Sequence, residues 1–462
     1  MTEQRPRAAW ILLRETQFRR YWAAAAVSYV GDQVSLLALP LLAVLLLDAT
    51  PAQMGYLTAA GLAPNLALAF VAGVWVDRRR HRRHVMIGAD IARCVLVFSI
   101  PLSSALGTLD MTQLYVVSFL VGACSCFYEV ANSTLFVSLV QPKQYVRASS
   151  LMNGARALSF VAGPSAAGAL VQLLGAPIAL ITDAVSYGFS ALLLGRTRAV
   201  EPAPAAPGRG QFSAGFRFLR SDRALNSLLI AVATLNLFNY MFNALMILYV
   251  TVHLNVTPGM LGLVLGVASV GALTGSLIAG PLSRTIGVGP AYVLGMIAFP
   301  LPLLLIPAAG GPQPMVLVLL FLAEALSGVG VMVLDITAGS LMAALIPHTL
   351  RARVSGMFRT VNYGIRPVGA LLGGALGTAL GVHNTLWVAS IGGSLAVLWL
   401  IGSPILRMRT LPETPPEPSF APADRPPTAQ QSTPPTPAES VPDRLPEPRR
   451  PDHDHDRPAD SR

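Results

Sequence analysis

Charged residues are scarce in this chain of 462 residues: Asp, Glu, Lys and Arg make up 12%, whereas hydrophobic residues make up 53%. Soluble domains normally carry roughly twice that charged fraction, so the composition excludes an ordinary soluble enzyme. The apolar residues occur in runs of about 20 to 30, each long enough to cross a hydrocarbon core of roughly 30 Å as a helix. The sequence therefore predicts an all-α polytopic membrane protein.

Cysteine and lysine are also rare. The three cysteines, Cys94, Cys124 and Cys126, lie within apolar runs, which excludes a disulfide framework and leaves no metal-ligand set. Lys143 is the only lysine and lies in no P-loop, so the sequence encodes no ATPase of that type. No nucleophile-elbow pattern is present either. We therefore expect no enzymatic activity, no cofactor and no bound metal, and energy drawn from an ion gradient or the substrate's own gradient.

The apolar runs and the breaks between them predict twelve transmembrane spans. Their ranges are 21–47, 54–76, 85–108, 112–140, 148–174, 176–195, 225–251, 258–282, 288–308, 314–346, 352–380 and 384–406. Basic residues precede the first span, follow the last, and fall in every second connection, while the alternate connections contain neither lysine nor arginine. By the positive-inside rule, this pattern predicts twelve helices with both termini in the cytoplasm. The net charge of +10 then reflects topology rather than nucleic-acid binding.

The longest internal connection divides the predicted helices into six plus six. We expect an N-terminal six-helix bundle at 1–195, a cytoplasmic linker at 196–224 and a C-terminal six-helix bundle at 225–406. The remainder, 407–462, contains 15 prolines and one aromatic residue, which predicts a disordered cytoplasmic tail. Small residues and prolines recur in the same order in both halves, which indicates two six-helix pseudo-repeats, as in transporters that alternate access around a midplane site.

The end of the second predicted helix carries the most informative motif, GVWVDRRRHRR, from Gly73 to Arg83. A glycine permits close helix approach, and arginines anchor a loop on the cytoplasmic side. The motif resembles the loop signature between helices 2 and 3 of the major facilitator superfamily. The resemblance implies a conformational latch between the two halves, and the alternative is a plain anchoring loop. The latch residues would be Gly73, Asp77, Arg78 and Arg82, with Asp90 and Arg93 in a structural role beside them.

A second motif lies in the fifth predicted helix, where Gly163-Pro164 precedes Gly168. Proline and glycine deform a helix and allow tight contact with a neighbour. In the superfamily, a Gly-Pro motif at this place is typical of exporting antiporters, and Arg156 lies on the same helix. Ala167 stands where a further glycine is usual, so an ordinary kinked packing helix is the alternative.

Shorter patterns resemble one branch of the superfamily, which contains macrolide efflux pumps and the enterobactin exporter. They are Gly31-Asp32, Asp90-Ile-Ala-Arg93, Asp183-Ala-Val-Ser-Tyr187 and Arg353-Val-Ser-Gly356. The resemblance covers about residues 18 to 406. It does not identify the cargo, because that branch contains exporters of many kinds.

Charges inside the bilayer are functional candidates because each is costly to insert. The ten candidates are Asp32, Asp90, Arg93, Glu129, Arg156, Asp183, Glu324, Asp335, Arg359 and Arg366. In the superfamily, helices 1, 4, 7 and 10 line the central cavity. The resemblance therefore implies that the acids on these helices couple transport to protons. These acids are Asp32, Glu129, Glu324 and Asp335.

Each acid also has a purely structural interpretation. Asp32 lies near mid-membrane and exchanges a proton if its cavity opens, unless a neighbouring helix simply satisfies it. Arg156 and Arg359 are candidates to neutralise Glu129 and Asp335. For Asp183, on a helix that is peripheral in this fold, we expect a role in packing.

The seventh predicted helix carries a polar stripe. Asn236, Asn239, Tyr240 and Asn243 are spaced by three or four residues and so share one face. A polar and partly aromatic face suits an amphipathic organic substrate, and interhelical hydrogen bonding explains it equally well.

Together these observations favour a secondary exporter in the inner cell membrane. We expect a monomer that exchanges an amphipathic small molecule, such as a drug, a macrolide-like compound or a siderophore-like metabolite, for protons. The alternatives are a proton-independent facilitator or importer of the same fold, and a membrane-bound sensor or scaffold that uses its Pro-rich tail.

Overall fold

The computed structural model describes residues 9–79, 81–198, 222–347 and 350–411, and these residues form helices and short connections without strands. Most of the predicted linker and tail lies outside the described residues. The helices of the first half are α1 (Thr16–Leu46), α2 (Pro51–Asp77), α3 (Arg82–Ala105), α4 (Met111–Leu139), α5 (Tyr145–Leu174) and α6 (Ala176–Gly195). Those of the second half are α8 (Arg223–Leu248), α9 (Pro258–Ile286), α10 (Val288–Ala298), α11 (Leu305–Ala308), α12 (Gln313–Leu345), α13 (Arg351–Leu380) and α14 (Val382–Leu395).

Helical segments overlap every range predicted from the apolar runs. In the described part of the chain, nine of them are long and apolar enough to cross a membrane. The ninth predicted range, 288–308, is not one α-helix: α10 ends at Ala298, and a 3-10 turn at Leu301–Leu304 precedes α11. Pro300 and Pro302 lie at this break, and proline cannot donate the backbone hydrogen bond that a continuous helix requires.

Local sequence explains where several helices begin. Thr50 caps α2 in a reciprocal capping box with Gln53. The Asp110 carboxylate accepts a hydrogen bond from the backbone N–H of Gln113 (3.0 Å), which caps α4 and lowers the pKa of this carboxyl. These caps fix two of the connections that lack basic residues.

The two halves repeat one tight connection. Gly175 is the single residue between α5 and α6, and Gly381 is the single residue between α13 and α14. Their φ angles are +83° and +84°, in the region that favours glycine. Corresponding helix pairs in the two halves are thus joined by the same backbone conformation.

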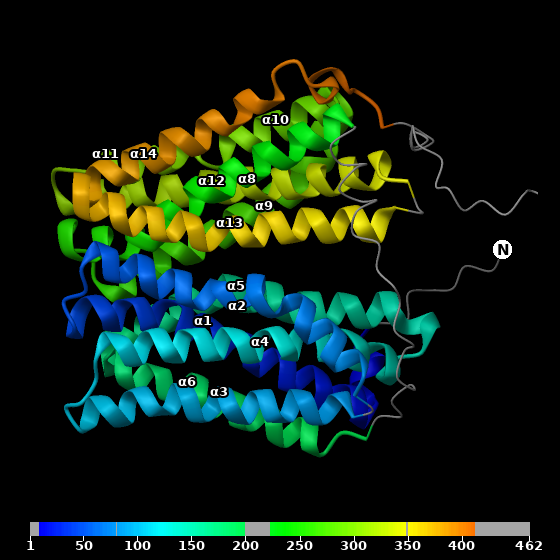
Figure 1. Ribbon diagram of the computed structural model, residues 1–462, viewed down its shortest axis with the longest axis vertical. Coiled ribbons are helices and arrows are strands. Elements are labelled where there is room, and N and C mark those ends of the chain that lie inside the picture. Colours follow the sequence, from blue (N-terminus) through cyan, green and yellow to red (C-terminus); the bar gives the residue numbers. More distant parts are fainter. Residues whose placement is uncertain (1–8, 80, 199–221, 348–349, 412–462) are drawn as a thin grey trace, which may run out of the picture. The chain divides into compact units, whose positions relative to one another are not determined.

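Helices α1–α6 pack mainly on one another, as do α8–α14, and the two groups meet where α5 packs along α9 and α13 along α2 (Figure 1). Glycines make both contacts close. A Cβ atom on Gly168 of α5 would lie 2.8 Å from the Cα atom of Gly262 of α9. A Cβ atom on Gly55 of α2 would likewise lie 2.8 Å from the Cα atom of Gly374 of α13. The backbones therefore touch at two equivalent places.

A large buried apolar cluster continues across this interface. It includes Leu41 of α1, Val171 of α5, Leu245 of α8 and Leu261 of α9. These residues lie toward the helix ends next to the arginine-free connections. At that end, apolar side chains and glycine contacts hold the two groups of helices together.

Candidate functional site

Three carboxyl groups and one guanidinium are gathered between α1, α3 and α6. We call Asp32, Asp90, Arg93 and Asp183 the charged cluster. Asp90 and Asp183 are completely buried, and Arg93 is 3% exposed. In water-free surroundings, charges are costly unless they are paired or hydrogen-bonded. The ion-pair and hydrogen-bond partners of each charged group therefore determine how its charge is stabilised.

Helical spacing brings these groups together. On α6, Asp183, Ser186, Tyr187 and Ser190 recur every three or four residues and form one polar face. On α1, Asp32 and Ser35 are separated by one turn, as are Asp90 and Arg93 on α3. Because α6 packs along both α1 and α3, its polar face meets both pairs.

Arg93 occupies the centre of the cluster. It forms an ion pair with Asp90, which also accepts a hydrogen bond from the Ser190 hydroxyl (2.7 Å). Its guanidinium lies 4.5 Å from the ring centroid of Tyr128 and 4.4 Å from that of Tyr187. Two aromatic faces and one carboxylate therefore compensate a buried positive charge.

Asp32 and Asp183 are held by hydroxyl groups. The Tyr187 hydroxyl donates to Oδ1 of Asp32 at 2.5 Å. Asp183 accepts from the hydroxyls of Ser35 and Ser186, the latter at 3.1 Å. Gly31 makes this approach possible, because a Cβ atom there would collide with Ser186 and Asp183. Asp32 is thus hydrogen-bonded by a residue of a neighbouring helix.

Asp32 also faces open space. It lines a cavity of about 500 Å³ to which α1, α4, α5 and α13 contribute, so both groups of helices form its wall. The charged residues of this wall are Asp32, Arg93, Glu129, Arg156 and Arg359. Among the described residues, Glu129 forms no ion pair with Arg156 or Arg359, and all three are exposed. Tyr29, Tyr128, Phe160 and Tyr363 add aromatic surface.

A second cavity of about 520 Å³ lies between α1, α2, α5 and α8. Asn239, Tyr240 and Asn243 of the predicted polar stripe line it, together with Pro164 of the α5 motif. The Asn243 amide donates to Asn239 of its own helix (2.8 Å), and that of Asn236 donates to the Val232 carbonyl (3.0 Å). Among the residues that the structure describes, these two amides therefore bond within α8 and not across helices.

Tyr240 does have a partner on another helix. Its hydroxyl accepts a hydrogen bond from Arg366 of α13 at 3.1 Å, and the Arg366 guanidinium also lies 4.2 Å from the ring centroid of Tyr363. Two further candidate acids of the second half are Glu324 and Asp335, and Asp335 interacts electrostatically with Arg366. Glu324 is 8% exposed and Asp335 is exposed, and neither lines the two cavities.

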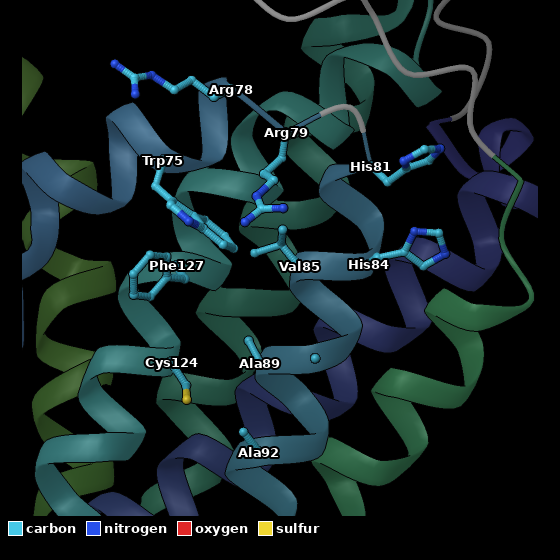
Figure 2. Close-up of a pocket in the computed structure, with 11 residues that line it drawn as sticks. Trp75, Arg78, Arg79, His81, His84, Val85, Ala89, Ala92, Cys124 and Phe127 are labelled. Atoms are coloured by element: carbon cyan, nitrogen blue, oxygen red, sulfur yellow. The ribbon is translucent and has the colours of Figure 1, made fainter.

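The arginine-rich motif borders a groove of about 770 Å³ at the end of α2 and the start of α3 (Figure 2). Trp75, Arg78, Arg79, His81 and His84 line it, and the Arg79 guanidinium lies over the Trp75 ring at 4.3 Å. The side chain of Asp77 is outside the described part of the chain.

Two other predicted latch residues have different surroundings. A Cβ atom on Gly73 would meet no described atom within 4 Å, so this glycine makes no close contact with a described helix in this conformation. Arg82 is 3% exposed. Asp90 and Arg93 are part of the charged cluster, with partners on α6 and α4.

The α5 motif lies at the interface between the two groups of helices. A Cβ atom on Gly163 would lie 2.6 Å from Cβ of Gln33 on α1, and Gly168 contacts α9 as described above. Pro164 is tolerated inside α5, which stays helical from Tyr145 to Leu174. Arg156, two turns earlier, is exposed and lies 5.7 Å from the ring centroid of Phe160.

Three residues that contact the charged cluster, Tyr187, Ser35 and Tyr128, are not among the site residues predicted from the sequence, and for Asp183 the sequence predicts a role in packing. The spacing of Asp183, Ser186 and Tyr187 was the available signal, because three polar residues on one face of a hydrophobic helix require polar partners. The helices that supply those partners depend on tertiary packing, which the sequence does not reveal.

In the described part of the chain, an all-helical architecture with two large cavities between two groups of membrane-crossing helices is that of a multi-pass membrane transporter. The model of the transmembrane secretion effector family, a branch of the major facilitator superfamily, matches residues 7–426, and the chain belongs to this family. The predicted superfamily membership is therefore confirmed, and the family is one of transporters rather than enzymes.

Relatives and solved structures agree with this assignment. The multidrug efflux pump Tap of Mycolicibacterium fortuitum is 26% identical over 409 residues, 85% of this chain and 97% of that protein. The pump of the same name from Mycobacterium tuberculosis is 27% identical over 403 residues, 83% and 92% of the two chains. A bacterial homologue of the iron transporter ferroportin in the inward-facing state superposes with a TM-score of 0.69 at 17% identity, over 84% and 98% of the chains. The nucleoside transporter NupG gives 0.68 at 12% identity, over 84% and 98%.

Proposed function

We propose that this protein is a secondary exporter that moves amphipathic small molecules out of the cell in exchange for protons. It acts in the inner cell membrane as a monomer with twelve spans, two six-helix halves and both termini in the cytoplasm. The distribution of arginines supports this orientation. Relatives named multidrug efflux pumps, aligned over most of both chains, support drug-like cargo and the export direction.

The position of Asp32 is the observation that carries the proton-coupling proposal. Its carboxylate accepts a hydrogen bond from Tyr187 inside the charged cluster, and the same side chain lines the 500 Å³ cavity. A carboxyl group in that place responds both to a cargo in the cavity and to the buried charges behind it. Intramembrane acids of this kind mark proton paths in many transporters.

The conformation fits the inward-facing stage of an alternating-access cycle. The glycine contacts and apolar packing close the helix ends next to the arginine-free connections, which lie outside in the proposed orientation. The 500 Å³ cavity includes Glu129, Arg156 and Arg359, which lie toward the opposite ends of their helices. Cargo would enter this cavity from the cytoplasm or the inner leaflet, and opening of the glycine contacts would release it outside.

The chemistry of the cavities favours an amphipathic cargo. In the 500 Å³ cavity, aromatic rings from α1, α4, α5 and α13 surround both acidic and basic groups. The 520 Å³ cavity is mainly apolar, with Asn239, Tyr240 and Asn243 as polar contacts. Apolar walls with a few placed polar groups are typical of sites that bind organic molecules.

Coupling requires that proton and cargo bias the same conformational change. Protonation of Asp32 from outside would favour cargo release and return of the empty carrier, and deprotonation toward the cytoplasm would restore affinity for cargo. Glu129, Asp335 and Glu324 remain further proton-coupling candidates. Of these, Glu129 has support from its place in the same cavity.

Transport into inverted membrane vesicles tests the proposal. Vesicles containing the full chain are given an acidic lumen, and accumulation of radiolabelled tetraphenylphosphonium and erythromycin is followed with and without a protonophore. We expect accumulation that the protonophore abolishes and that Asp32→Asn reduces at least about tenfold. Accumulation that does not depend on the proton gradient would support the proton-independent facilitator instead.

Asp110→Asn is the matched control. It makes the same chemical change at an exposed helix cap, and asparagine caps a helix about as well as aspartate. This variant should transport like the parent protein. Equal gradient-driven transport by Asp32→Asn and Asp110→Asn would overturn the role of Asp32.

A further inference from the structure

The charged cluster contains more acid than its single base can neutralise. Arg93 forms an ion pair with Asp90, and both are buried. Asp32 and Asp183 therefore have no cation of their own within the cluster. If all three carboxyl groups were ionised, the cluster would carry two more negative than positive charges, one of them on the completely buried Asp183, which is strongly unfavourable.

Asp183 is the less accessible of the two remaining acids. It is completely buried on α6, whereas Asp32 on α1 is partly exposed to the cavity. The titratable and charged groups around Asp183 come from α1, α3 and α6. They are Asp32 of α1, Arg93 and Cys94 of α3, and Tyr187 of α6, while Asp90 of α3 and Arg156 of α5 face Asp32.

Hydroxyl groups connect Asp183 to the surroundings of Asp32. Ser35 donates to Asp183 and lies one turn after Asp32 on α1, and Tyr187 donates to Asp32 and lies one turn after Asp183 on α6. A hydroxyl can donate or accept, so Ser35 stays bonded whether Asp183 is ionised or neutral. Asp32, Ser35 and Tyr187 also line one further cavity of about 230 Å³, which has room and polar partners for water.

We propose that Asp32 and Asp183 form a carboxyl pair that holds one exchangeable proton, and that cargo binding in the central cavity releases it. This inference rests on the proposed proton-coupled export and deepens it. In the transfer, the Asp183 O–H bond breaks, Ser35 accepts that proton and passes its own through water to the Asp32 carboxylate. Asp32 then gives the proton to water in the 500 Å³ cavity. The net change is one proton lost from the pair.

The pair accounts for retention of the proton until cargo binds. The two carboxyl groups share this proton, and the negative charge of the ionised group opposes ionisation of the other. A cationic cargo in the cavity offsets the added negative charge. A single carboxyl group beside Arg93 would lose its proton at lower pH and would already be ionised when cargo arrives.

Cargo-induced proton release in solution tests the pair. The purified full chain in detergent and weak buffer is mixed with tetraphenylphosphonium, and protons are counted with a pH indicator between pH 5 and 9. The parent protein should release protons with a defined midpoint. In Asp183→Asn, Asp32 loses its acidic neighbour, so the midpoint should move to lower pH by about one unit or more.

A second variant gives a shift of opposite sign. Ser35→Ala leaves both acids in place but removes a hydrogen-bond donor to ionised Asp183, so the proton is retained longer and the midpoint should move to higher pH. A merely structural defect does not produce opposite shifts. The Ser35→Ala measurement also tests the pair if Asp183→Asn fails to fold.

The outcomes separate the two proposals. No proton release by the parent protein would overturn the proposed coupling itself. Release that is lost in Asp32→Asn but has an unchanged midpoint in both Asp183→Asn and Ser35→Ala would leave Asp32 coupled and overturn the pair. Asp110→Asn should match the parent protein throughout.

Discussion

Gly168 of α5 and Gly262 of α9 are in direct backbone contact, since a Cβ atom on Gly168 would lie 2.8 Å from the Cα atom of Gly262. The equivalent pair, Gly55 and Gly374, joins α2 to α13. The four glycines hold the two groups of helices together at one end. In an alternating-access cycle, these are the contacts that must separate when the transporter opens outward.

Substitution of one of these glycines should therefore weaken the closed end. In Gly168→Ala, the new methyl group would also lie 2.5 Å from the Pro258 carbonyl oxygen, and neither backbone atom has room to move independently. We expect a loss of about 1–3 kcal/mol in the free energy of unfolding, measured by thermal denaturation in detergent, together with slower transport. Gly280→Ala on α9 is the control, because its Cβ atom would meet nothing within 4 Å. Equal stability of the two variants would contradict this account of the interface.

Gly31 should be equally intolerant of a side chain. A Cβ atom there would collide with Ser186 and Asp183, so Gly31→Ala pushes α1 away from the polar face of α6. We predict a destabilisation of about 1–3 kcal/mol and reduced proton-driven uptake into vesicles. Gly154→Ala, where the methyl group meets no atom within 4 Å, should behave like the parent protein. Normal uptake by Gly31→Ala would show that the spacing between α1 and α6 is unimportant.

Because Arg93 and Asp90 form an ion pair, the effect of substituting one on the unfolding free energy should depend strongly on whether the other is present. Arg93→Met leaves the Asp90 carboxylate buried without its cation, which should cost roughly 3–5 kcal/mol in unfolding free energy. Adding Asp90→Asn removes that stranded charge, so the double variant should regain part of the loss. Unfolding in detergent measures both, and Arg284→Met, at an exposed site, is the control. Additive losses in the double variant would argue against a direct pair.

One variant can decide whether the polar stripe of α8 serves helix packing or cargo binding, because packing affects the unfolding free energy and cargo binding affects KM. Asn243 is exposed to the 520 Å³ cavity, and its amide bonds only within its own helix among the described residues. Asn243→Ala should therefore change unfolding free energy by less than about 0.5 kcal/mol, while the KM for erythromycin or tetraphenylphosphonium changes severalfold. A large loss of stability with unchanged KM would assign the stripe to helix packing.

The sequence reveals the helices of this protein better than its site. Long apolar runs and alternating arginine-rich connections locate the membrane helices, because the bilayer imposes length and charge asymmetry directly on the sequence. The interruption of the ninth range at Pro300 and Pro302 is a local effect of proline. Asp32 is visible as an acid in an apolar helix.

The partners of Asp32 are not visible in the sequence, because they come from helices distant in the chain. Tyr187 lies on α6, and the polar face of that helix meets α1 and α3 only through packing. From their closeness to the arginine-rich motif along the chain, the sequence predicts a structural role beside it for Asp90 and Arg93. Their contacts with Ser190 and Tyr128, which belong to the charged cluster, are not visible in the sequence.

Comparison of two transport modes in one vesicle preparation tests the central claim most directly. Proton-coupled export through Asp32 predicts that Asp32→Asn still exchanges external for internal tetraphenylphosphonium, because exchange needs no net proton movement. The same variant should fail to accumulate this cation when an acidic lumen is imposed. Accumulation at the parent rate, with a protonophore abolishing it in both proteins, would contradict the account and place the coupling group elsewhere.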